Sequence, residues 1–121
     1  MKVFFSEKDN VLIVKITGEL DHHNAPQIRE ETDFKIINNN IKYVIFDFTN
    51  LSFMDSSGVG VIIGRYKLLS SLKGSLYIVS PSKNVNRLLE LSGIPKIIKM
   101  YKSIEEVEIN FEGSVLFEQA K

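Results

Sequence analysis

The feature that most constrains the fold is an alternation between short apolar segments of strand type and amphipathic segments of helix type. The clearest strand lies in IKYVIFDF, where residues 43–46 are all apolar, as in a central strand that is covered on both faces. A helix pattern follows over residues 56–71, and its apolar stripe comprises Val59, Ile62, Ile63, Tyr66 and Leu69. Strands that alternate with helices predict an α/β fold with a mostly parallel sheet.

The segments before this pair predict a hairpin and a first helix. Residues 3–6 and 11–17 flank the turn EKDN and are rich in branched and aromatic side chains, so we expect an antiparallel hairpin and hence a mixed sheet. Asn24 is the expected N-cap of the first helix, with Pro26 in its first turn, and the run NNN should end that helix. Its expected buried face comprises Ala25, Ile28, Thr32 and Ile36.

The segments after the central pair predict further strands and a third helix. TNLSFMD is interpreted as a connection that leads into the helix at 56–71, and Gly74 as the residue that ends this helix. SLYIVS and KIIKMY are strand candidates. Between them, Ser80 is the expected N-cap of a helix with Pro81 at its first position, and Gly93 should close it.

A final helix is expected from Ser103, with an interruption at Gly113. The whole pattern predicts one α/β domain over residues 1–121, with about four or five strands and about four helices.

Charge and composition remove several classes of function. Lys+Arg and Asp+Glu balance at 15 each, so no global field favours direct binding to nucleic acid or to an anionic membrane. There is no cysteine, which excludes disulfides, thiolate chemistry and zinc–thiolate sites. The apolar runs are far shorter than the roughly 20 residues of a membrane-spanning helix. We therefore expect a soluble, cytoplasmic protein.

The sequence Asp55-Ser56-Ser57 falls where function is expected in an open α/β sheet, at the corner that follows the central strand. Asp55 is the expected N-cap of the helix, and the two serines would occupy its first two positions. Free backbone N–H groups and the positive end of the helix dipole converge there, so the corner accepts an anion readily. Capping alone would also explain these residues.

Glycines in the same helix need a separate explanation. Gly58, Gly60 and Gly64 each cost roughly 1 kcal/mol relative to alanine in a helix interior. Either they allow close packing against a neighbouring element of the fold, or they leave a surface that a partner can approach. Further along, we expect Arg65 and Lys67 to be exposed on either side of a buried Tyr66.

Three sequence blocks carry a resemblance to a known family. GELDHHNA, LSFMDSSGVGVIIGRYK and LSGIPKII resemble, in order and spacing, the anti-sigma factor antagonists of the STAS-domain family, in particular those of sporulation. The similarity covers roughly residues 11–101. It implies a STAS-like fold and a non-enzymatic role in a phosphorylation switch. In this family the serine directly after the aspartate is phosphorylated, and that position is Ser56 here, with Ser57 as the alternative acceptor.

The resemblance also implies the partners and the binding surface. The unphosphorylated antagonist binds an anti-sigma factor that is also a serine kinase, which frees the sigma factor, and a separate serine phosphatase restores it. ATP and Mg²⁺ belong to the kinase, so we expect no cofactor in this chain, and we expect a monomer or weak oligomer. The implied partner-binding residues are Asp21, His22, Asp55, Ser56, Ser57, Gly58, Gly60 and Arg65.

A phosphate on Ser56 would act through charge. It adds about −1.5 to −2 charges beside Asp55, and also near Asp21 if that loop lies on the same rim. The helix N-terminus tolerates this charge, so we predict that phosphorylation blocks the interface without refolding the helix.

Three alternatives remain open at this stage. The stretch ELDHH holds two histidines and two carboxylates, although it lacks a metal-ligand spacing such as HxH. Ser56 or Ser57 could serve as a nucleophile with His22 or His23 as base, although the sequence has no G-x-S-x-G elbow. A non-enzymatic STAS scaffold module of a stress-signalling complex is the third alternative.

Overall fold

A hairpin at the amino terminus begins the sheet in the computed structural model, which describes residues 1–108. Strands β1 (Lys2–Lys8) and β2 (Val11–Leu20) pair antiparallel, with Lys8 opposite Val11. Asp9 in the turn has a φ of 56°, a left-handed conformation that aspartate adopts more readily than most residues. The predicted hairpin is confirmed, and both of its strands extend further than the sequence pattern indicates.

The remaining strands join in parallel, which confirms the predicted mixed, mostly parallel sheet. The strand order is β1-β2-β3-β5-β6, and a further strand, β4, pairs with β2. The parallel strands are β3 (Tyr43–Asp47), β4 (Leu51–Met54), β5 (Ser75–Val79) and β6 (Lys99–Tyr101). The sheet thus has six strands, one more than the upper end of the expected number.

Strand β4 corrects the interpretation of TNLSFMD as a plain connection. Gly18 has a φ of 99°, and the register between β2 and β4 shifts there, since Gly18 pairs with Leu51 and Glu19 with Phe53. The first half of β2 pairs with β3, and its second half is left free to pair with β4. Because β2 and β4 run parallel to each other, Leu20 and Met54 are partners and both strands end at the same place.

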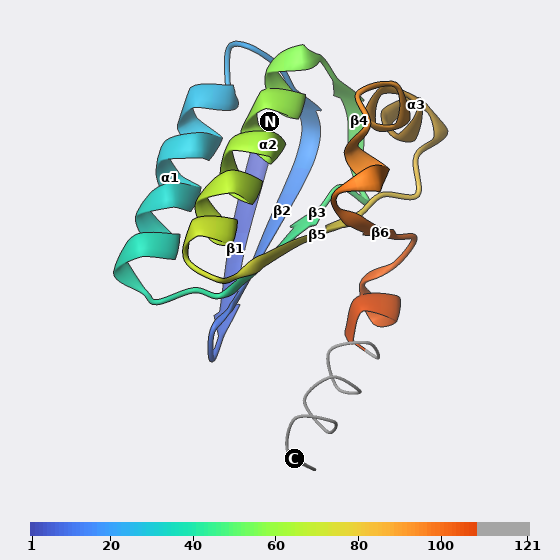
Figure 1. Ribbon diagram of the computed structural model, residues 1–121. Helices are drawn as coiled ribbons and strands as arrows, with labels where there is room; N and C mark the ends of the chain where they lie inside the picture. The colour runs from blue at the N-terminus through green and yellow to red at the C-terminus, as the bar shows by residue number, and fades with distance from the viewer. Residues whose placement is uncertain (109–121) are drawn as a thin grey trace.

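Two long helices cover one face of the sheet side by side (Figure 1). The first, α1 (Ala25–Asn38), buries the four predicted residues: Ala25, Ile28, Thr32 and Ile36. The second, α2 (Ser56–Ser71), has the bounds that the sequence predicts. Asn40, with a φ of 52°, follows α1, in agreement with the expectation that the asparagine run ends this helix.

The ends of the next two helices differ from the sequence interpretation. Lys73, with a φ of 61°, takes the left-handed position after α2, whereas Gly74 lies so close to the Lys42 carbonyl that a Cβ atom would come within 2.3 Å of its oxygen. Helix α3 (Lys83–Leu91) begins after Ser82, whose Oγ accepts a hydrogen bond from the Val85 N–H at 3.4 Å.

Ser80 is not the N-cap of α3, because its backbone continues the pairing of β5: its N–H donates to the Tyr101 carbonyl at 2.9 Å. Pro81 therefore falls in the connection. Gly93, with a φ of 78°, follows α3 as expected and leads into the short 3₁₀ helix η1 (Ile94–Lys96).

The sheet has an apolar core on each face because its side chains alternate. Val44 and Phe46 of β3 point into the larger core beneath α1 and α2, while Ile45 points into a smaller core on the other face. Residues 104–108 are helical and contribute the fully buried Val107 to that smaller core. The final helix expected from Ser103 is thus confirmed over these residues, and Gly113 lies outside the described part of the chain. None of the helices within residues 1–108 is long and apolar enough to span a bilayer.

Candidate functional site

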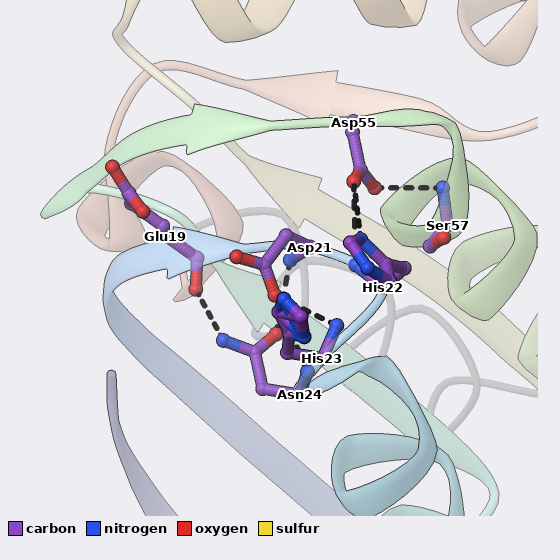
Figure 2. A network of polar contacts seen from close by, with 7 residues as sticks. All are labelled: Glu19, Asp21, His22, His23, Asn24, Asp55 and Ser57. Atoms are coloured by element: carbon purple, nitrogen blue, oxygen red, sulfur yellow. Dashed lines mark hydrogen bonds and ion pairs between the residues drawn. The ribbon is translucent and has the colours of Figure 1, made fainter.

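The predicted corner at the start of α2 is held by the Asp55 carboxylate (Figure 2). Its Oδ1 accepts a hydrogen bond from the Ser57 N–H at 2.8 Å, which is the capping bond that the sequence predicts. Its Oδ2 accepts from the His22 N–H at 3.2 Å, so the same carboxylate also holds the loop that precedes α1. The His22 Nδ1 atom lies 3.8 Å from Oδ2. Asp55 therefore joins two loops that are 33 residues apart in sequence.

The two loops meet because β2 and β4 end together. The Asp55 N–H donates to the Leu20 carbonyl at 3.2 Å, immediately before each strand gives way to its helix. Carboxyl ends of parallel strands share one edge of a sheet, and helix N-termini gather at the same edge. The Asp21 loop therefore lies at the same edge of the sheet as the serines, as expected, and we call this edge the rim.

Asp21 itself is occupied by its own turn. Its Oδ1 accepts hydrogen bonds from the backbone N–H groups of His23 at 2.9 Å and Asn24 at 3.3 Å. Asn24 occupies the N-cap position of α1, but its side chain accepts from the Asp21 N–H and donates to the Glu19 carbonyl instead of capping the helix. The loop is thus ordered by its own polar side chains, and His22 is the member that reaches across to α2.

The two serines differ in exposure. Ser56 is the first residue of α2 and is exposed, whereas Ser57 is half-buried and gives its N–H to Asp55. Both occupy the first two helical positions, as predicted. An enzyme that acts on this corner therefore has freer access to the Ser56 hydroxyl.

The charge at the corner follows from the hydrogen bonds of Asp55. Partial burial raises the pKa of this carboxyl, but backbone N–H groups of Ser57, His22 and Gly58, together with the charge of His22, lower it, and the net pKa lies below the ordinary value. Asp55 is therefore ionised and acts only as an acceptor near neutral pH.

The three glycines of α2 divide between the two explanations that the sequence leaves open. A Cβ on Gly58 would lie 2.5 Å from the Met54 Cγ, so this glycine allows close packing of α2 on the end of β4. Apart from the adjoining residues and the backbone of α2 itself, no heavy atom lies within 4 Å of a Cβ on Gly60 or Gly64. These two glycines instead help to line a shallow depression of about 470 Å³ between α1 and α2.

The depression lies directly beside the corner. His22, Pro26 and Arg29 line it from the loop and α1, while Ser57 and Val61 line it from α2. A partner could thus contact the corner and the depression at once.

The sequence profile of the STAS domain matches residues 5–107. The chain belongs to the STAS-domain family. It is 40% identical over 103 residues to the anti-sigma F factor antagonist of Paenibacillus polymyxa, a match that covers 82% of this chain and 88% of that protein. The resemblance carried by the three sequence blocks is confirmed.

Two solved structures of SpoIIAA also resemble this STAS domain. The anti-sigma factor antagonist SpoIIAA in its unphosphorylated form matches with a TM-score of 0.74 and 29% identity, over 90% of this chain and 96% of that one. The phosphorylated form of the Bacillus cell fate determinant SpoIIAA matches with a TM-score of 0.72 and 29% identity, over 88% of this chain and 97% of that one. The STAS-like fold expected from the sequence is confirmed.

The exposure predicted for Arg65 is wrong for this STAS domain. Its side chain is not exposed: the residue retains only 7% of its accessible surface, and its Nε lies 2.6 Å from Oδ1 of Asp33 on α1. Its Nη1 group also donates to the Val61 carbonyl at 3.2 Å. Burial lowers the pKa of the guanidinium, against the opposing effect of Asp33. Arg65 thus forms part of the floor of the depression and joins the two helices, whereas Lys67 is exposed as predicted.

Sequence reasoning missed five residues that line the depression. They are Ala25, Pro26, Arg29, Val61 and Gly64, none of which was assigned to the partner surface. The spacing of three between Pro26 and Arg29, and of four between Gly60 and Gly64, places residues on one side of each helix, but the pairing of those two sides requires the fold. For the alternative of a metal site at ELDHH, residues 1–108 contain no group of three or more side chains placed to hold an ion.

Proposed function

We propose that this STAS domain is an anti-sigma factor antagonist whose binding is switched by phosphorylation of Ser56. In its unphosphorylated form it binds an anti-sigma factor that is also a serine kinase, and the sigma factor is released. The observation that carries the proposal is that Ser56 is exposed at the start of α2, directly after the capping residue Asp55, while the neighbouring Ser57 lines an open depression. The similarity to antagonists named for sigma F supports the same role.

The phosphate acceptor is Ser56 and not Ser57. Ser56 is exposed, whereas Ser57 is half-buried and tied through its backbone to Asp55. The γ-phosphoryl group of ATP is transferred to the Ser56 Oγ, the hydroxyl proton passes to a base of the kinase, and ADP leaves. ATP and Mg²⁺ are held by the kinase, and a separate serine phosphatase removes the phosphate by hydrolysis. The chain itself is a cytoplasmic, non-enzymatic regulator that presents one hydroxyl.

Phosphorylation blocks binding through charge and bulk at the rim. The phosphate carries about −1.5 to −2 charges and stands beside the ionised Asp55, so the rim becomes strongly anionic. The backbone N–H groups at the start of α2 accommodate this charge, which leaves the helix intact. The unphosphorylated and phosphorylated forms of SpoIIAA resemble this chain to nearly the same degree, with TM-scores of 0.74 and 0.72, which supports a switch without refolding.

The partner contacts the rim and the depression together. Asp21 and His22 order the first loop, Asp55 joins it to α2, and Gly60 and Gly64 allow a partner's backbone to come close to the helix. Gly58 and Arg65 act from beneath, by packing α2 on β4 and on α1.

Phosphate mapping tests the assignment. The protein is incubated with the candidate anti-sigma kinase and Mg-ATP, and intact mass and peptide masses are measured. We expect one phosphate on Ser56 in the wild type, none in Ser56→Ala, and one in the matched control Ser57→Ala. A phosphate that moves to Ser57, or no phosphate on the folded protein with a kinase that is active on another antagonist, would contradict the proposal.

A further inference from the structure

A second surface, separate from the rim, carries an exposed aromatic patch. Phe4 on β1 is 58% exposed, and Phe34 on α1 is 65% exposed. Phe5, Glu30, Glu31, Phe34 and Lys35 line a groove of about 430 Å³ between β1 and α1. Phe4 points to the opposite face of the sheet, because Val3 and Phe5 on either side of it pack against the larger core. We call the five groove residues the β1–α1 patch. It shares no residue with the rim or with the depression beside it.

The patch lies at a free edge of the sheet. β1 ends the strand order and pairs only with β2 in the described part of the chain, so one side of this seven-residue strand presents unpaired backbone groups. Natural edge strands are commonly protected by brevity or by charged side chains along their length. Here Val3, Phe4 and Phe5 form a continuous apolar stretch between Lys2 and the polar end of the strand at residues 6–8, and β6 at the opposite edge is only three residues long.

We propose that the β1–α1 patch binds a second copy of this chain, with β1 paired antiparallel to β1 of that copy around a two-fold axis. The main argument is that the charges of the patch complement themselves. Glu30 and Glu31 precede Phe34 on α1, and Lys35 follows it. A two-fold axis reverses the second helix, so the acidic pair of one copy faces Lys35 of the other, with Phe34 between them.

The charges on β1 also select the register. Residues directly opposite each other in an antiparallel sheet point to the same face, so a two-fold axis must pass through a residue position. An axis at Phe5 would place Lys2 opposite Lys8 twice, and like charges in that position are destabilising. An axis at Phe4 places Phe4 opposite Phe4, and Val3 opposite Phe5. The second register pairs apolar residues on both faces of the sheet.

Sedimentation equilibrium of the full chain over a wide concentration range tests the association. We expect the mass to rise from one chain toward two, and Phe34→Glu to raise the dissociation constant at least tenfold. Phe53→Glu is the matched control, because Phe53 is also an exposed aromatic, at 47%, and lies on β4 outside the patch. A wild type that keeps the mass of one chain throughout, or a control that weakens association as strongly, would overturn the proposal.

A charge exchange keeps the test independent of folding defects. Lys35→Glu should weaken association, and the triple variant Glu30→Lys, Glu31→Lys, Lys35→Glu should restore it, because the opposite charges again face each other across the axis. Failure of the triple variant to recover while Lys35→Glu is impaired would contradict the two-fold arrangement.

Crosslinking tests the register, since the chain has no cysteine of its own. Under mild oxidation, Phe4→Cys should form a covalent dimer much faster than Lys8→Cys, because only position 4 meets its own copy across the axis. Faster crosslinking through position 8 would exclude this register.

Discussion

At the scale of single residues, the Asp55 carboxylate does two things at once. It caps α2 through the Ser57 N–H and holds the loop before α1 through the His22 N–H. Asp55→Ala should therefore lower the free energy of unfolding by about 0.5–2 kcal/mol, the usual range for a lost cap. Asp55→Asn should lose much less, because an amide oxygen can still accept from Ser57. Urea denaturation of the three proteins measures the difference, and equal losses in both variants would argue against capping.

The lowered pKa of Asp55 also predicts a dependence on pH. A carboxyl whose pKa is lower in the folded state binds fewer protons there than when unfolded. Its contribution to stability is full above the unfolded pKa, which is about 3.9, and is lost as the pH falls through the folded value. The wild type should thus lose more stability than Asp55→Asn on acidification below pH about 4. The free energy of unfolding of both proteins is measured as a function of pH. An equal loss of stability in the two proteins on acidification would count against this mechanism.

Two glycines of α2 should respond to alanine in opposite directions. Gly58→Ala places a Cβ against Met54, so it should destabilise the protein by about 1–3 kcal/mol, the usual cost of overpacking. Gly60→Ala meets open space and should stabilise the helix by up to about 1 kcal/mol. Thermal unfolding measures both. Under the proposed function, Gly60→Ala should also weaken binding to the anti-sigma factor, although the domain is more stable.

Single residues also show where sequence reasoning reaches its limit. The positions of Asp55, Ser56 and Ser57 at the start of α2 follow from the chemistry of a helix start, so they were predictable. Arg65 was not, because a charged residue on a glycine-rich helix is usually exposed, and its partner Asp33 lies on another helix. The link between His22 and Asp55 likewise depends on two strands that end together.

At the scale of elements, α1 and α2 are joined by the Asp33–Arg65 ion pair, whose arginine lines the depression. Arg65 is buried, but the Asp33 side chain is 30% exposed, so solvent reduces the value of the pair. Arg65→Ala should cost about 1–3 kcal/mol, and a double-mutant cycle with Asp33→Ala should show a coupling of about 0.5–3 kcal/mol. A coupling near zero would mean that Arg65 contributes through packing alone.

The elements that the sequence predicts well are those whose signal is local. The bounds of α2 and the buried face of α1 follow from helical periodicity. Both predictions agree with the structure. Strand β4 has only four residues, and it pairs with residues 18–20 of β2, beyond the part of β2 that pairs with β3. The start of α3 was placed two residues too early for a similar reason, since Ser80 is retained by pairing with Tyr101. These features depend on partners that are distant in sequence.

At the scale of the whole molecule, the two proposed binding surfaces lie on different parts of the chain. The rim gathers at the ends of β2 and β4 and the start of α2, while the β1–α1 patch lies along the free edge of the sheet. A second copy on the patch would therefore leave Ser56 exposed.

The alternation of strands and helices was sufficient to predict the α/β architecture, because each parallel strand pair needs a crossover connection.

The central claim is that phosphorylation of Ser56 switches off binding to an anti-sigma factor. Calorimetric titration of that partner with unphosphorylated protein, with protein phosphorylated at Ser56, and with the phosphorylated sample after phosphatase treatment tests it most directly. We predict tight binding in the first case, a loss of at least tenfold in affinity in the second, and full recovery in the third. Equal affinity of the first two samples, with Ser56 fully phosphorylated, would contradict the account.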